Sequence, residues 1–182
     1  MKLSEYLTKM RGTTQSSPPR VNNSEIIWSW IGAFFGIAIV AWADHFFFEG
    51  TDLSLLVGSL GASAVLIYGA NRSPLAQPRN LVGGHIVSAI VGVTCWKLFH
   101  HYPWLAEAVA VATSIAIMHL TRTLHPPGAA TALIAVIGSP SVHNIGYLYV
   151  LVPAALGPII MLFVALLINN IPSSRRYPEI WF

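Results

Sequence analysis

The sequence predicts an all-α fold: a polytopic helical membrane protein of about six transmembrane segments. Of its 182 residues, 54% are hydrophobic and only 9% are charged, whereas soluble domains carry about a quarter charged residues. Long apolar runs alternate with short polar stretches, and the second and fifth runs are interrupted by glycine or proline. We therefore expect two inverted three-segment repeats, each with a broken or half-length helix in its middle.

The first 24 residues form a polar tail, which we expect in the cytoplasm. It lacks the apolar core of a signal sequence and contains a Ser-Ser-Pro-Pro break and four basic residues, Lys2, Lys9, Arg11 and Arg20. Residues 3–10 have the pattern of a short amphipathic helix on the membrane surface, and a mobile tail is the alternative. The transmembrane domain is expected over residues 25–172, and residues 173–182 form a cytoplasmic C-terminal tail.

The first half has predicted segments at residues 26–43, 53–70 and 81–95. Tryptophans near the ends of the first segment suit an interfacial belt, and an acidic loop follows, with Asp44, Glu49 and Asp52. In the second segment, Gly-Ser-Leu-Gly at residues 58–61 predicts local unwinding, which a membrane tolerates only beside protein or a water-filled cavity. In the third segment a small residue recurs every four positions and predicts tight helix packing, at Gly84, Ser88 and Gly92.

The second half opens with a predicted helix at residues 104–121, followed by a shorter apolar run. This run starts at His125-Pro126-Pro127-Gly128 and stops at Gly138, about half the length that a ~30 Å hydrocarbon core requires. Prolines suit a first helical turn, so free amides of Gly128, Ala129 and Ala130 are expected to point toward His125 and to favour an anion. A proline-marked turn before an ordinary short helix is the alternative.

A polar turn is expected at residues 139–144, before a last segment at residues 146–168 that is kinked by Pro153 and Pro158. If all six segments cross, nine of the ten Lys and Arg residues lie on the side of the N-terminus, and only Lys97 lies opposite. The positive-inside rule then places both termini in the cytoplasm. Residues 61–67 also match residues 128–134 at four of seven positions, which favours an inverted repeat.

Three motifs resemble the HPP family of integral membrane proteins. They are the runs at residues 58–64, at 73–80 with Gly83-Gly84-His85, and at 125–133. Members in cyanobacteria and chloroplasts are described as nitrite transporters, so the resemblance implies nitrite transport. The family is usually described with four spanning helices, fewer than the charges favour here, and some relatives carry an additional soluble regulatory domain. Because no transit sequence is evident, we expect a bacterial plasma (inner) membrane.

Transport of a small planar anion requires hydrogen-bond donors that replace water without holding the ion too tightly. We expect these donors at and beside the two half-helices, and the candidate residues are Ser59, Gly61, Ser63, Arg79, Asn80, His85, Arg122, His125, Gly128 and Thr131. Arginines at the cytoplasmic mouth would concentrate anions, and the histidines would donate to the anion or shuttle a proton. The alternatives are lipid-anchoring or topology-marking arginines, self-bonded hydroxyls and structural histidines.

Other classes of function have less support in the residues. We expect no enzyme, because the seven acidic residues lie in loops or near helix ends and no Ser-His spacing indicates a nucleophile. No ligand spacing indicates a metal or another cofactor, and the net charge of +3 reflects topology rather than nucleic-acid binding. A cation or proton-coupled transporter and a non-transporting scaffold remain alternatives, and channel, uniport and symport mechanisms stay open. Glycine faces on the first and third helices leave room for a homo-oligomer in the lipid bilayer.

Overall fold

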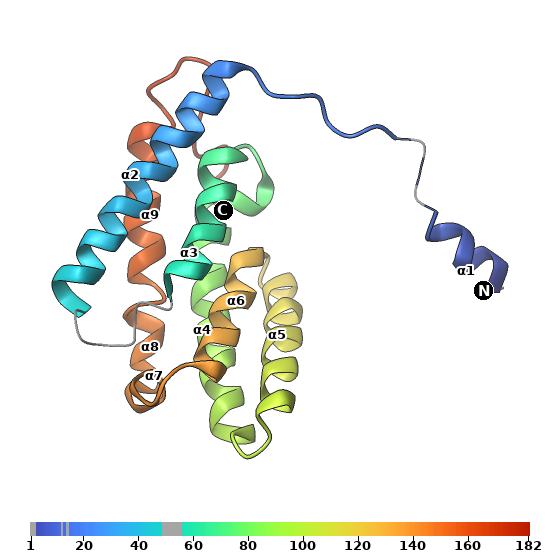
Figure 1. The fold of residues 1–182 in the computed structure, drawn as a ribbon, viewed down its shortest axis with the longest axis vertical. Helices are drawn as coiled ribbons and strands as arrows, with labels where there is room; N and C mark the ends of the chain where they lie inside the picture. Colours follow the sequence, from blue (N-terminus) through green and yellow to red (C-terminus); the bar gives the residue numbers. More distant parts are fainter. Residues whose placement is uncertain (1–2, 12, 14, 49–55) are drawn as a thin grey trace.

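The computed structural model describes residues 3–11, 13, 15–48 and 56–182. Within these residues the regular structure is helical (Figure 1). In chain order the helices are α1 (Leu3–Lys9), α2 (Asn23–Phe48), α3 (Leu56–Ala64), the π-helix η2 (Val65–Gly69), the 3-10 helix η3 (Pro74–Ala76), α4 (Pro78–Phe99), α5 (Pro103–Leu120), α6 (Pro126–Ile137), α7 (Pro140–Ile145), α8 (Leu148–Leu151) and α9 (Leu156–Ile168). The predicted all-α class is therefore confirmed.

Four helical runs in the described part of the chain are long and apolar enough to cross a membrane. They are Asn23–Phe47, Pro78–Phe99, Pro103–Leu120 and Leu148–Ile168. Two further apolar helices, Gly58–Gly69 and Pro126–Ile137, are shorter. Helices thus form in all six predicted apolar segments, whereas the arrangement of these segments as an inverted repeat stays a prediction.

Outside the long helices, the structure agrees with some local predictions and differs from others. Residues 3–10 largely form the predicted helix, α1, whose side chains are exposed. Asp44 lies inside α2 rather than in a loop, while Glu49, Asp52 and residues 53–55 lie outside the described residues. The polar turn expected at residues 139–144 is instead mostly helix α7, because Pro140 stands in the first turn, where its missing N–H costs nothing. Of the two predicted kinks, the one at Pro153 is a break between α8 and α9, and Pro158 lies in the first turn of α9.

The two short helices depart from a regular span in different ways. α6 has prolines in its first turn and ends before Gly138, as predicted. α3 is a continuous helix through residues 58–61, so the expected unwinding there is wrong. Helical hydrogen bonds are kept because an apolar environment offers the backbone no other partner, and the irregularity comes later, in η2. In Figure 1, α3 and α6 both begin near mid-height and run in opposite directions.

The start of α6 is more closed than predicted. The Gly128 amide donates to the His125 carbonyl oxygen over 2.8 Å, so one of the three amides expected to be free is already bonded. Gly128 also packs tightly on α4, since a Cβ there would lie 2.8 Å from the Gly84 carbonyl oxygen. At this position a close contact between two backbones replaces the expected open group of donors.

The glycine stripes pack within the chain itself. A Cβ at Gly92 would lie 2.5 Å from the Ala132 carbonyl oxygen, which confirms tight packing of α4, here against α6. On α2, a Cβ at Gly32 would lie 2.5 Å from Cδ1 of Tyr68, and Gly36 faces the same tyrosine ring. The glycine faces that suggested a homo-oligomer are therefore already filled, which removes the argument for one.

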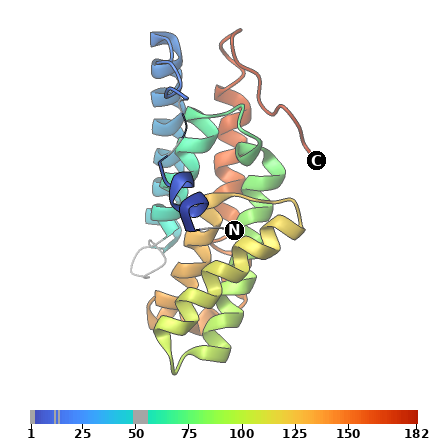
Figure 2. The same cartoon turned by 90° about the vertical axis from the view of Figure 1, so that its right-hand side faces the viewer.

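A C-terminal segment closes the end of the bundle at which α2 begins and α9 ends. The Arg175 side chain is only 1% exposed and pairs with Glu25 at 2.8 Å. It also donates to Ser29 Oγ over 2.9 Å and to Asn169 Oδ1 over 3.2 Å. We call Arg175, Glu25, Ser29 and Asn169 the arginine clasp. In Figure 2 the segment after α9 rises beyond that helix and turns back beside α4, so the predicted tail is docked on the bundle.

Candidate functional site

A buried polar cluster lies where α3, α4 and α6 meet. Ser63 Oγ of α3 is 2.9 Å from His85 Nε2 of α4 and 2.9 Å from His125 Nε2 at the start of α6. The three residues have no exposed surface, and the two imidazole centroids lie 5.2 Å apart. Two ring nitrogens from different helices therefore converge on a single hydroxyl oxygen.

The outer ring nitrogens of this cluster are bonded as well. His85 Nδ1 lies 2.7 Å from Thr131 Oγ1, and His125 Nδ1 lies 2.8 Å from the Leu75 carbonyl oxygen. Thr131 is itself fully buried, and its carbonyl oxygen accepts from the Tyr149 hydroxyl over 3.0 Å. We call Ser63, His85, His125 and Thr131 the histidine centre. Each imidazole nitrogen in it has a partner.

The local sequence explains why His125 reaches this position. His125 is the N-cap of α6 and has an extended backbone, with φ −140° and ψ 103°, the conformation that a residue before proline favours. Its Cβ lies where a side chain at Gly84 would stand, because a Cβ built on Gly84 would come within 2.6 Å of it. The prolines set the direction of His125, and Gly84 gives it room next to His85.

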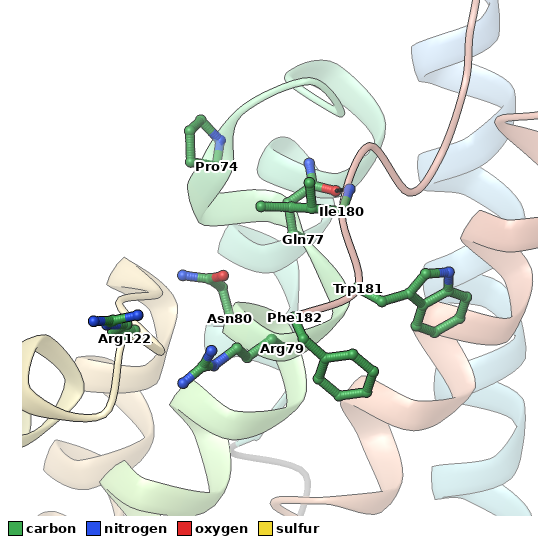
Figure 3. A pocket seen from close by; sticks show the side chains of 8 residues that line it. All are labelled: Pro74, Gln77, Arg79, Asn80, Arg122, Ile180, Trp181 and Phe182. Carbon is green, nitrogen blue, oxygen red and sulfur yellow. Dashed lines mark hydrogen bonds between the residues drawn. The ribbon is translucent and has the colours of Figure 1, made fainter.

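A second polar group surrounds a pocket of about 290 Å³ at the start of α4 (Figure 3). Its lining includes Arg79 and Asn80 from α4 and Arg122 from the turn after α5. Arg79 Nη2 donates to the Thr121 carbonyl oxygen over 2.7 Å, and Asn80 Nδ2 donates to the Leu124 carbonyl oxygen over 2.9 Å. In Figure 3 both side chains point toward the segment that carries Arg122. We call this pocket the arginine mouth.

The predicted site residues thus fall into two groups with two exceptions. Ser63, His85, His125 and Thr131 form the histidine centre, and Ser59 joins it through its carbonyl oxygen, 3.2 Å from Ser63 Oγ. The arginine mouth gathers the polar residues Arg79, Asn80 and Arg122. The exceptions are Gly128, which packs on Gly84, and Gly61, which borders a groove facing α2. Because α3 does not unwind, the Gly61 backbone stays in the helix and turns away from the centre.

Four residues that contribute to these groups were not identified from the sequence. Tyr149 stands in an apolar run, and its hydroxyl, which must find a partner when buried, was the available signal. The Leu75 carbonyl oxygen carries no signal in a sequence. Trp181 and Phe182 line the arginine mouth, and only the docking of the C-terminal segment brings them there. Among the described residues, no group of three or more His, Cys, Asp or Glu side chains is placed to hold a metal ion.

Comparison with known proteins agrees with the three motifs. Residues 18–178 match the family described as HPP, transmembrane region. This chain belongs to the HPP family. The HPP chain is 44% identical over 181 residues to a Dictyostelium discoideum transmembrane protein. The aligned region covers 98% of this chain and 58% of the relative. It is 40% identical over 186 residues to a second transmembrane protein of the same organism. That aligned region covers 100% of this chain and 65% of the relative.

No solved structure is a significant match to the HPP chain. The chain spans less than two thirds of the length of both relatives, at 58% and 65%. Their names describe them only as transmembrane proteins. Since both come from Dictyostelium discoideum, the comparisons do not support the expected bacterial membrane, and the cytoplasmic position of the termini stays a prediction.

Proposed function

We propose that this HPP protein transports a small inorganic anion across the membrane, that nitrite is its substrate, and that the histidine centre is the anion site. One observation carries the proposal: the Nε2 atoms of two fully buried histidines converge on one oxygen, Ser63 Oγ, at 2.9 Å each. Buried ionisable side chains in a membrane protein are costly and are typically functional. The hydroxyl oxygen stands where an oxygen atom of a bound anion would accept a hydrogen bond from an imidazole that carries a hydrogen on Nε2.

The proposed binding step exchanges one oxygen for another. Rotation of the Ser63 side chain would withdraw its hydroxyl from between the two imidazoles. An anion oxygen could then accept from an imidazole that carries a hydrogen on Nε2, and an added proton on that ring would make the hydrogen bond charge-assisted and stronger. Few donors are needed, because a transported ion must also leave.

The arginine mouth provides the proposed approach to this site. Two guanidinium groups raise the local concentration of anions, and a pocket of about 290 Å³ has room for a hydrated small anion. The bond from Asn80 to the Leu124 carbonyl oxygen ties the mouth to the residue next to His125. In the full proposal, α3 and α6 belong to two inverted halves that meet at the contact between Ser63 and His125, with the mouth on the cytoplasmic side.

The test is anion uptake by the purified full chain in proteoliposomes, with nitrite, nitrate, chloride and formate compared. We expect saturable nitrite uptake above that of protein-free liposomes. His125→Gln should lower the uptake about tenfold or more, the equivalent of one charge-assisted hydrogen bond of about 1.5–3 kcal/mol. Arg79→Gln should raise the nitrite concentration at half-maximal rate, because it removes charge at the mouth rather than at the site.

Matched controls are available in the same chain. His119→Gln changes an exposed histidine of α5, and Arg176→Gln changes an exposed arginine beyond α9. Both should transport like the unmodified protein. If nitrite uptake does not exceed that of protein-free liposomes, or if His125→Gln and His119→Gln behave alike, the proposed anion site is wrong and cations become the next substrates to test.

A further inference from the structure

We infer that the histidine centre is a proton relay that ends in a proton store at His125, so that one proton enters with each anion. This inference rests on the transport role proposed above and adds the proton as a second substrate. Its starting point is the contact of His125 Nδ1 with the Leu75 carbonyl oxygen at 2.8 Å. A carbonyl oxygen only accepts hydrogen bonds, so this contact requires a hydrogen on His125 Nδ1.

That requirement fixes every other hydrogen in the neutral centre. A neutral imidazole carries one N–H, so His125 Nε2 is an acceptor. The Ser63 hydroxyl donates to it over 2.9 Å, a shorter contact than the 3.2 Å to the Ser59 carbonyl oxygen. Ser63 has no second hydrogen, so it accepts from His85 Nε2–H. His85 Nδ1 is then an acceptor, and the Thr131 hydroxyl donates to it. The contacts of 2.7, 2.9, 2.9 and 2.8 Å therefore form one chain of donors that points from Thr131 to Leu75.

Such a chain can take up one proton without breaking a contact. The Thr131 hydroxyl proton moves to His85 Nδ1 while the incoming proton takes its place on Thr131 Oγ1, and the proton on His85 Nε2 moves to Ser63 Oγ. The original Ser63 hydroxyl proton moves to His125 Nε2, which makes His125 an imidazolium with a hydrogen on both nitrogens. Each contact from Thr131 to His125 then has the opposite donor, and the one added charge is on His125.

The relay stores the proton because its last partner cannot pass it on. The Leu75 carbonyl oxygen accepts the hydrogen on His125 Nδ1 but has no hydrogen of its own to release. A proton on His125 therefore leaves only by the way it came or after His125 moves away from Leu75. This property separates a coupled carrier, which moves a proton only with a conformational change, from an open proton channel.

The surroundings of His125 leave its added charge without a protein counter-ion. The groups beside the centre are Ser59 of α3, Met118 of α5, Tyr149 of α8 and the carbonyl oxygen of Leu75 in η3. Ser88 of α4 donates to Met118 Sδ rather than to the centre. None of these groups in the described part of the chain is charged, and the arginine mouth is cationic. Burying an unpaired charge is strongly unfavourable, so the protonated centre needs a bound anion.

The first test reads the tautomers directly and does not depend on transport. In ¹⁵N NMR spectra of the full chain with labelled histidines at alkaline pH, His125 should carry its hydrogen on Nδ1 and His85 on Nε2. Variants His85→Gln and His125→Gln assign the two signals. If both rings carry the hydrogen on Nε2, the bond to Leu75 does not form and the relay is overturned.

The second test measures proton uptake with nitrite in proteoliposomes that contain a trapped pH dye, after subtraction of the rate in protein-free liposomes. We expect about one proton per nitrite, because the two charges compensate each other in the centre, and uptake that follows the pH gradient rather than the membrane potential. Ser63→Ala should abolish this pH-driven component, whereas Ser88→Ala, a change at another buried serine, should leave it. Nitrite uptake that follows only the membrane potential would overturn the proton store and leave anion transport standing. No nitrite uptake under either gradient would overturn the anion transport itself.

Discussion

The arginine clasp and the histidine centre are polar clusters at different places in this HPP protein. They differ in whether the donor and acceptor of their hydrogen bonds can exchange roles. In the arginine clasp, Arg175 only donates, to Glu25, Ser29 and Asn169. In the histidine centre, each imidazole and hydroxyl can donate or accept, and the carbonyl oxygens of Leu75 and Ser59 are its fixed acceptors. A cluster with a fixed charge and fixed donors suits a structural joint. A cluster whose donors can exchange roles suits the binding and release of a proton or an anion.

The largest expected effect is on folding, from Arg175→Gln in the arginine clasp. The change leaves Glu25 without its partner and removes donors to three elements of the fold, α2, η2 and the end of α9. The Glu25 side chain is 27% exposed, so we expect a loss of about 3 kcal/mol, the lower end of the range for breaking a buried ion pair. Thermal unfolding in detergent should show this loss, while Arg176→Gln at the exposed neighbouring position should unfold like the unmodified protein.

The same variant also tests whether the two clusters have separate roles. Nitrite uptake per folded Arg175→Gln molecule should equal that of the unmodified protein, measured after correction for the folded fraction. Arg175→Lys should also be destabilised, because an ammonium group cannot reach the partners of a planar guanidinium. A stable Arg175→Gln variant with lost uptake would reverse the roles assigned to the clusters.

A smaller effect on folding and a larger one on transport are expected from Thr131→Val in the histidine centre. Valine has a similar shape, but it leaves His85 Nδ1 without its donor at 2.7 Å. An unsatisfied buried acceptor costs about 1–3 kcal/mol, and the middle of this range lies below the loss expected for Arg175→Gln. Thermal unfolding and nitrite uptake should be measured on the same preparation of each variant. The prediction is wrong if Thr131→Val is as destabilised as Arg175→Gln, or if Thr131→Val transports nitrite normally.

The sequence contained enough to predict α6 and the residues at its start. Two adjacent prolines, a following glycine and a short apolar run determine where that helix begins and ends, and these are local properties. His85, His125, Ser63 and Thr131 could be selected because polar side chains are rare in apolar segments. That they contact one another, rather than face separate cavities, depends on the packing of three helices and could not be deduced.

The sequence reasoning failed where long-range packing changes the role of a residue. Arg175 was counted among the charges that set topology, but its side chain is buried and pairs with Glu25. Because 149 residues lie between the two in the chain, the pairing could not be deduced from local sequence. The glycines of α2 resemble an open packing face until Tyr68 is seen to fill it. The unwinding predicted for α3 failed because glycine permits an irregular backbone without requiring it.

The smallest expected effect concerns Tyr177, at the edge of the arginine clasp. Burial raises the pKa of Tyr177, so its hydroxyl stays protonated at neutral pH and donates to the Ala76 carbonyl oxygen over 2.7 Å. Tyr177→Phe should cost about 1 kcal/mol at neutral pH. Because the folded-state pKa lies above the unfolded value of about 10, stability should fall as the pH rises past that value. Unfolding measured between neutral and strongly alkaline pH should show a smaller alkaline loss in Tyr177→Phe, and an equal loss in both proteins would mean that Tyr177 is not held protonated by the fold.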